Sequence, residues 1–235
     1  MMGVALSVAG PPLLLGGLLD WVLDDAWGTL LDALAAVTGV EMLGYPFMQR
    51  AYLAAVCIAV IGPLVGSFLV HREMAMIGDT LAHSAFAGVA VGLFVNATFA
   101  LSVPPLLTAL VVAVVAAVLV QLLVDHVGTY TDTSLAVVLT GAFAVGSVLV
   151  TATDGGIAVG INAYLFGSLA TVTRDSVGIL LAMTLLVSAV VAVAYRPLLY
   201  ATFDEVGARA AGLHVGRYNL LLVVLTAVVV VAAMQ

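Results

Sequence analysis

Residues Pro104–Val124 read PPLLTALVVAVVAAVLVQLLV, a stretch without a single ionisable side chain. A helix needs about 20 apolar residues to cross roughly 30 Å of hydrocarbon, and this stretch has that length. Strands of transmembrane β-barrels are only about 10 residues long and alternate apolar with polar positions. The stretch therefore predicts a membrane-spanning α-helix, because a helix satisfies its own backbone hydrogen bonds within lipid.

Five more segments have a comparable length and apolar character. Four of them contain no ionised residue, and the fifth contains Asp79 and His83. The segments are Ala51–Val70, Ser134–Ala152, Ser176–Tyr195, Tyr218–Met234 and Met74–Val95. The fold class predicted from them is all-α, a polytopic transmembrane helical bundle located in the plasma membrane.

The overall composition agrees with this fold class. Of the 235 residues, 64% are hydrophobic and 8% are charged. Soluble proteins carry roughly 45–50% apolar and about 25% charged residues, which excludes a soluble fold and a disordered chain. The net charge of −7 lacks the basic footprint of a nucleic-acid-binding protein.

The first 49 residues differ from the rest. Leu13–Leu19 is apolar, but four aspartates follow within a short distance. We interpret residues 1–49 as an extramembrane or interfacial segment and residues 50–235 as the transmembrane domain, with an extra span in the first segment as the alternative. The positive-inside rule places the acidic segment outside, because it puts four of the six arginines in cytoplasmic loops. Those four are Arg72, Arg196, Arg209 and Arg217.

Asp79 and His83 form the first candidate site. They are four residues apart, so in a helix they project from one face. A charge near the bilayer centre costs on the order of 2.5–3.5 kcal/mol, which makes an intramembrane aspartate a functional candidate. Carboxylate and imidazole groups both bind zinc and manganese. Three interpretations are open: contact with a passing divalent cation, a proton relay, and a hydrogen-bonded pair that positions helices.

A polar segment, Phe203–Gly212, is the second candidate. It reads FDEVGARAAG, with acids first and an arginine late, as the helix dipole favours, and a glycine suited to the C-terminal left-handed position. It is predicted to be a short helix, either an ordinary solvated loop element or a docking element that a cytoplasmic motor could push. Its candidate coupling residues are Phe203, Asp204, Glu205, Ala208, Arg209 and Gly212.

Two pairs of glycines occur at close-packing spacing. Gly62 and Gly66 are four residues apart, as are Gly88 and Gly92. Small residues at this spacing let membrane helices approach closely. Glycine is also common in membrane helices, so the spacing alone leaves both interpretations open.

Several short motifs together resemble the permease subunits of ABC-type importers of zinc, manganese and iron. The resemblance runs from about Tyr45 to Gln235. The motifs, in family order, are YPFMQRA (45–51), GSFLV (66–70), MIGDTLAHSA (76–85), DT (132–133), AYLFGS (163–168) and TFDE (202–205).

The resemblance implies a function and a set of partners. It implies a permease for zinc, manganese or iron that works as a homodimer with two ATP-hydrolysing subunits and an extracellular metal-binding protein. It assigns metal contact to Asp79 and His83, and ATPase coupling to Phe203–Gly212. No permanently bound cofactor is expected, and ATP is expected on the partner subunit. Family members continue past the position of Gln235, so the chain is expected to lack the family's C-terminal spans.

Two other functions remain as alternatives. One is a secondary transporter or channel coupled to protons; the other is a truncated membrane subunit that does not transport. The sequence shows no phosphate-binding G-x-x-x-x-G-K loop and no nucleophile paired with a base. The chain is therefore not expected to be an enzyme by itself.

Overall fold

The computed structural model describes residues 21–99, 101–124, 130–152 and 173–234, and all regular elements in these ranges are helices. Six helices within these ranges are long and apolar enough to cross a membrane. They are α3 (Pro46–His71), α4 (Ile77–Phe99), α5 (Pro105–Leu122), α6 (Thr131–Ala152), α8 (Arg174–Phe203) and α10 (Val215–Ala233). The predicted all-α multi-pass membrane fold is thereby confirmed.

The short elements are η1 (Trp21–Gly28), α2 (Thr29–Thr38), η2 (Glu41–Gly44) and α9 (Glu205–Ala210). Residues 155–172 are too short and glycine-rich for a full span, and their sequence predicts a short helix that only partly enters the membrane; this segment lies outside the described ranges. The largest difference at a boundary concerns the predicted span Ser176–Tyr195, because α8 continues past Tyr195 and through Pro197 to Phe203. Proline is tolerated inside membrane helices because neighbouring groups satisfy the freed carbonyl.

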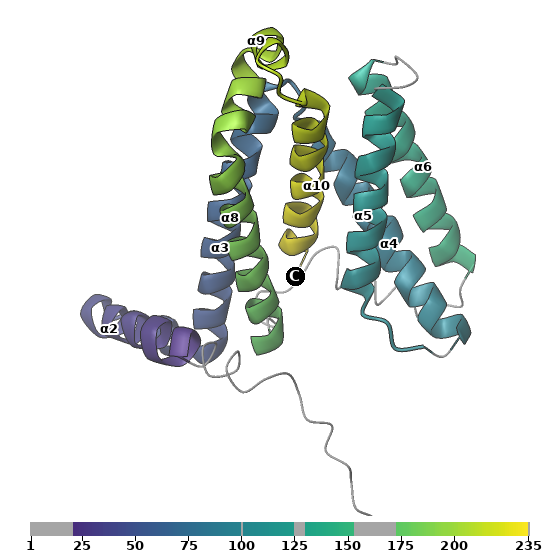
Figure 1. The fold of residues 1–235 in the computed structure, drawn as a ribbon. Helices are drawn as coiled ribbons and strands as arrows, with labels where there is room; N and C mark the ends of the chain where they lie inside the picture. The colour runs from purple at the N-terminus through teal and green to yellow at the C-terminus, as the bar shows by residue number, and fades with distance from the viewer. Residues whose placement is uncertain (1–20, 100, 125–129, 153–172, 235) are drawn as a thin grey trace, which may run out of the picture. The chain divides into compact units, whose positions relative to one another are not determined.

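The chain divides into two compact units, and α3 and α8 contribute to both. The first unit holds the described residues up to Ala54 together with those from Thr173 to Gly178. In this unit α2 runs across the first turns of α3 (Figure 1). One hydrogen bond joins α2 to α3, from Gln49 Nε2 to Asp32 Oδ1 at 2.8 Å, and a second joins η1 to α3, from the Trp27 indole Nε1 to the Gln49 carbonyl at 2.8 Å.

The second unit contains most of the membrane-length helices. In it α4 packs on α5 and α6, and α10 packs on α5 and α4. Within the chain, 50% of the apolar 18-residue window of α4 is buried, whereas only 11% of the corresponding window of α6 is buried. The Phe68 and Tyr195 rings meet edge to face, with centroids 6.4 Å apart, where α3 lies along α8. The centre of this unit is therefore α4, and α6 is its least covered helix.

The two glycine pairs behave differently. A Cβ atom at Gly88 would lie 2.5 Å from Ala109 Cα, and one at Gly92 would lie 2.2 Å from Thr108 Oγ1, so both glycines face α5 directly. A Cβ atom at Gly62 or Gly66 would meet nothing within 4 Å in the described part of the chain. The close-packing interpretation therefore holds for Gly88 and Gly92.

Candidate functional site

Asp79 and His83 lie on the first two turns of α4, on one face as predicted. His83 Nε2 is 3.6 Å from Asp79 Oδ1. The Asp79 side chain is 66% exposed and that of His83 is 36% exposed. The His83 ring also meets the Phe143 ring of α6 edge to face, with centroids 5.5 Å apart. The Asp79 carboxylate is thus mostly open to the surroundings of the chain, whereas the His83 ring is partly covered and packs against Phe143.

The neighbouring face of the same turns is closed. The side chains of Thr80 and Ser84 are fully buried. Ser84 Oγ donates to the Thr80 carbonyl at 2.8 Å, and Thr80 Oγ1 lies 3.2 Å from the Met76 carbonyl and 3.4 Å from the Leu135 carbonyl. These hydroxyls are used within the bundle, so Asp79 and His83 are the groups that α4 offers to an external ligand.

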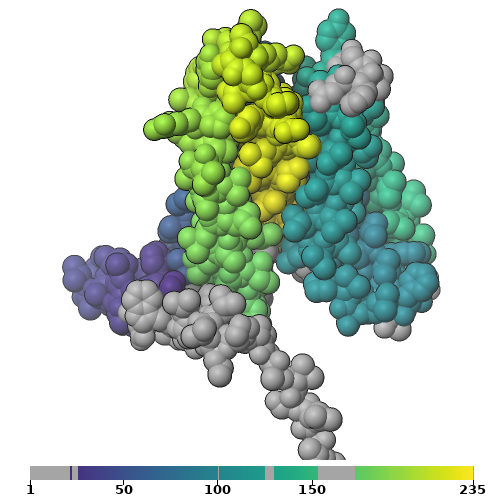
Figure 2. Space-filling model, viewed as in Figure 1, coloured from purple at the N-terminus to yellow at the C-terminus, as the bar shows by residue number. Residues whose placement is uncertain are grey.

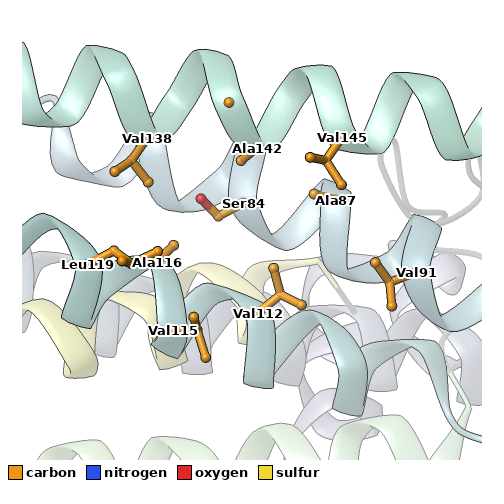
Figure 3. A pocket seen from close by; sticks show the side chains of 11 residues that line it. Ser84, Ala87, Val91, Val112, Val115, Ala116, Leu119, Val138, Ala142 and Val145 are labelled. Atoms are coloured by element: carbon orange, nitrogen blue, oxygen red, sulfur yellow. The ribbon is translucent and has the colours of Figure 1, made fainter.

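An open cavity of about 280 Å³ lies between α4, α5 and α6 (Figure 3). Its wall is apolar apart from the Ser84 hydroxyl, which is directed to the Thr80 carbonyl. A cation needs oxygen, nitrogen or sulfur ligands, so this cavity is no ion site. The residues that line it include Ala87, Val112, Ala116, Val138, Ala142 and Val145.

Asp79 and His83 do not form a complete metal site with the other residues that the structure describes. In the described ranges no group of three or more histidine, cysteine, aspartate or glutamate side chains is close enough to hold one ion. Two ligands suit a transient contact, and a tightly held zinc ion usually has four. Any further ligands would come from water, from the rest of the chain or from another molecule.

The predicted helix in Phe203–Gly212 is present as α9. Asp204 caps it, with Oδ1 accepting from the Gly207 amide at 2.8 Å. Gly212 has φ +84°, and the Leu213 amide donates to the Ala208 carbonyl at 3.0 Å, which completes a left-handed C-terminal cap. The sequence thus predicted the helix and the glycine at its C-terminal end, and the structure adds the Asp204 cap at its start.

The two faces of α9 differ. Ala208 is fully buried and packs with Ala201 and Val215, at the end of α8 and the start of α10. Val206 is 80% exposed and Phe203, the last residue of α8, is 66% exposed. α9 therefore stands at one end of this unit with an apolar side chain directed outward (Figures 1 and 2).

The structure groups the coupling residues together and pairs Asp79 with His83, but no hydrogen bond or ion pair joins the two groups among the described residues.

One polar residue that the sequence prediction did not assign to a site is Arg72, directly after α3. Its Nε donates to Thr202 Oγ1 at 2.9 Å, and its Nη1 donates to Asn219 Oδ1. In the sequence, Arg72 lies at the edge of a predicted span, and this position was used only to predict the orientation of the chain in the membrane.

Comparison with known proteins identifies the family. Residues 44–235 match the ABC 3 transport family. The chain is 32% identical over 197 residues to the manganese transport system membrane protein MntC of Halalkalibacterium halodurans, covering 83% of this chain and 64% of that protein. It is 31% identical over 194 residues to a probable metal transport system membrane protein of Treponema pallidum, covering 83% and 70%.

A solved structure agrees. PsaBC from Streptococcus pneumoniae in complex with Fab superposes with a TM-score of 0.69 at 25% identity, over 83% of this chain and 68% of that one. The chain thus spans about two thirds of the length of the proteins it matches. The match of residues 44–235 covers well over half of the chain and shows that this protein belongs to the ABC 3 transport family.

Proposed function

We propose that the chain is the membrane permease subunit of an ATP-driven importer for a divalent transition metal ion. Manganese is favoured over zinc and iron because a relative is named for manganese transport. The observation that carries the proposal is the exposed Asp79–His83 pair on a membrane-length helix of a chain in this family. A carboxylate oxygen and an imidazole nitrogen are both ligands for such ions.

The two-ligand geometry supports a dimer. One chain offers one carboxylate and one imidazole, whereas two copies facing a shared passage would offer four ligands. The ion would be held weakly by either copy alone and released when the copies separate, as transport requires. ATP hydrolysis is assigned to separate ATPase subunits that act on α9, and ion delivery to an extracellular metal-binding protein. The permease itself performs no chemical step.

The experiment is manganese uptake by cells that express the chain with its ATPase and binding protein and lack other manganese importers. The variant is Asp79→Asn combined with His83→Gln, which keeps the size of both side chains and removes the carboxylate and the imidazole. We expect uptake to fall by about tenfold or more. Asp175→Asn is the matched control, because Asp175 is an exposed aspartate in the first turn of another membrane-length helix.

Uptake at the wild-type rate in the double variant would remove the pair from the pathway. The same cells separate ATP-driven transport from proton-coupled transport. A substitution that abolishes ATP hydrolysis in the partner should stop uptake. Uptake that continues, and that collapses when the proton gradient is dissipated, would favour the proton relay at Asp79 and His83.

The N-terminal residues 1–49 fit an interfacial segment in this proposal. α2 runs across the start of the membrane-length α3, so it would lie along the membrane surface (Figure 1). Leu30, Leu34 and Val37 follow one side of α2 at helical spacing and are 51%, 43% and 84% exposed. The indole of Trp27 is of the kind that favours the boundary between lipid and water.

A further inference from the structure

Arg72 joins three helices that are distant in the sequence. It follows the last residue of α3. Its Nε bonds Thr202, 130 residues later on α8, and its Nη1 bonds Asn219, 147 residues later on α10. Planar guanidinium groups carry five donors in a fixed fork, so one arginine can hold two acceptors at a set angle. Arg72 therefore fixes the spacing of α3, α8 and α10 at this end.

The surroundings of Arg72 make its guanidinium group dependent on these hydrogen-bond partners. Partial burial lowers the pKa of Arg72, and the negative charge of Glu205 acts in the opposite direction. The guanidinium stays charged, because arginine remains protonated in proteins. Charged groups withdrawn from water depend on their partners, and removing one partner leaves the charge uncompensated. Thr202 Oγ1 donates its own proton to the Leu198 carbonyl at 2.7 Å, which leaves its lone pairs for Arg72.

Arg72 also faces the coupling helix. A small cavity of about 170 Å³ is lined by Arg72, Met74, Ala201, Thr202, Glu205 and Asn219. Glu205 is the first residue of α9, and its Oε1 pairs with Arg209 at 2.5 Å. Nη2 of Arg72 is buried and has no hydrogen-bond partner among the described residues. Nη2 is thus an unpaired buried nitrogen of a residue that lines the same cavity as Glu205.

Apolar contacts hold α9 at the same place. Ala208 of α9 packs with Ala201 of α8 and Val215 of α10. The His71 ring, at the end of α3, meets the Phe203 ring edge to face at 5.2 Å. The Ala208 contact ties α9 to α8 and α10, whereas α3 is joined to the same two helices by the His71–Phe203 ring contact and by the hydrogen bonds of Arg72.

We propose that Arg72 is the positioning residue that transmits movement of α9 to α3 and α10. When α9 is displaced toward α3, the Glu205 carboxylate has an unused donor to meet, Nη2 of Arg72, in exchange for Arg209. The three helices then move as one group. The inference rests on the proposed function in one respect: the displacement of α9 is assigned to the ATPase partner.

The first test needs no transport. The purified chain in lipid nanodiscs is examined by hydrogen exchange at α9 and at the first two turns of α10. Arg72→Gln should raise exchange there by about tenfold or more, and Arg72→Lys should restore only part of the protection, because an ammonium cannot span both acceptors in the fork geometry. Arg196→Gln is the matched control, since Arg196 is an exposed arginine of α8, and it should leave exchange unchanged.

A second variant covers the case in which Arg72→Gln does not accumulate. Asn219→Leu keeps the arginine and removes one acceptor, and it should raise exchange in the same amides. The double variant Arg72→Gln with Asn219→Leu should be no worse than Arg72→Gln alone, since both act on one contact. Unchanged exchange in Arg72→Gln or in Asn219→Leu, or fully additive effects of the two, would overturn the proposal.

The second test measures coupling in the assembled importer, as manganese ions moved per ATP hydrolysed. Arg72→Gln should lower this ratio by about tenfold or more while the ATPase still co-purifies, and Arg72→Lys should recover part of it. A structural role alone would lower the amount of complex and leave the ratio unchanged, which would also overturn the proposal. If the wild-type complex moves no metal, the proposed function fails, whereas the hydrogen-exchange result still decides whether Arg72 links the helices.

Discussion

Replacing Gly88 by alanine should destabilise the bundle because α4 and α5 have no space for a methyl group between them. The new Cβ would lie 2.5 Å from Ala109 Cα, about 0.9 Å short of the 3.4 Å at which contact becomes ordinary. The next atoms, the Thr108 carbonyl oxygen at 2.8 Å and the Ala109 amide nitrogen at 3.0 Å, are also backbone. No side-chain rotation relieves the clash, so α5 must shift.

Overpacking of this kind costs about 1–3 kcal/mol. Gly62→Ala is the matched control, because its Cβ would meet nothing within 4 Å among the described residues. Alanine gains up to about 1 kcal/mol over glycine in a helix, and this gain applies to both variants. The difference between them therefore isolates the clash, with Gly88→Ala the less stable by about 1–3 kcal/mol.

The assay is reversible unfolding of the purified chain in mixed micelles, followed by circular dichroism at increasing denaturing detergent. Gly88→Ala should unfold at lower detergent than the wild type, and Gly62→Ala at the same or higher detergent. Equal stability of the two variants would refute the claim that the Gly88 face is a backbone-to-backbone contact. Equal destabilisation of both would refute the claim that the Gly62 face is open.

Two further predictions concern the ends of the chain's short helices. Gly212→Val should weaken co-purification of the ATPase without reducing membrane insertion, because a β-branched residue at φ +84° costs about 1–3 kcal/mol and disrupts the end of α9. The control is Gly216→Val, at a glycine with open surroundings. Equal co-purification of the ATPase with both variants would contradict the docking role. A spin label attached to the Val37→Cys variant should be more accessible to oxygen, which concentrates in lipid, than to a water-soluble nickel complex. A label attached to the Ala36→Cys variant should show the reverse. Access of the nickel complex to both positions would place α2 in water.

Features that depend on neighbours in the sequence could be predicted without the structure. The hydropathy of about 20 consecutive residues is sufficient to predict a membrane-spanning helix. The shared face of Asp79 and His83 follows from their spacing of four. The caps of α9 depend on Asp204 and Gly212, within ten residues of each other. Each of these is set by local backbone geometry, which sequence patterns report directly.

Features that depend on distant segments could not be predicted in this way. Gly62 and Gly66 have the same spacing as Gly88 and Gly92, and only the position of α5 distinguishes the two pairs. The partners of Arg72 lie more than a hundred residues away, so its sequence context indicates a membrane edge and nothing more. The continuation of α8 through Pro197 could not be predicted either, because the effect of a proline inside a helix depends on the groups around it.

The two sides of α4 differ in how much they resist displacement. Toward α5, backbone meets backbone at Gly88, so the two helices are constrained to travel as a rigid pair. Toward α6, the nearest neighbour of the Gly146 face is the ring of Phe86, and the open cavity of about 280 Å³ lies between α4, α5 and α6 (Figure 3). A ring can rotate where a backbone cannot, so the contact that adjusts more readily is the one with α6, where a small tilt would also change the contact of Phe143 with the His83 imidazole.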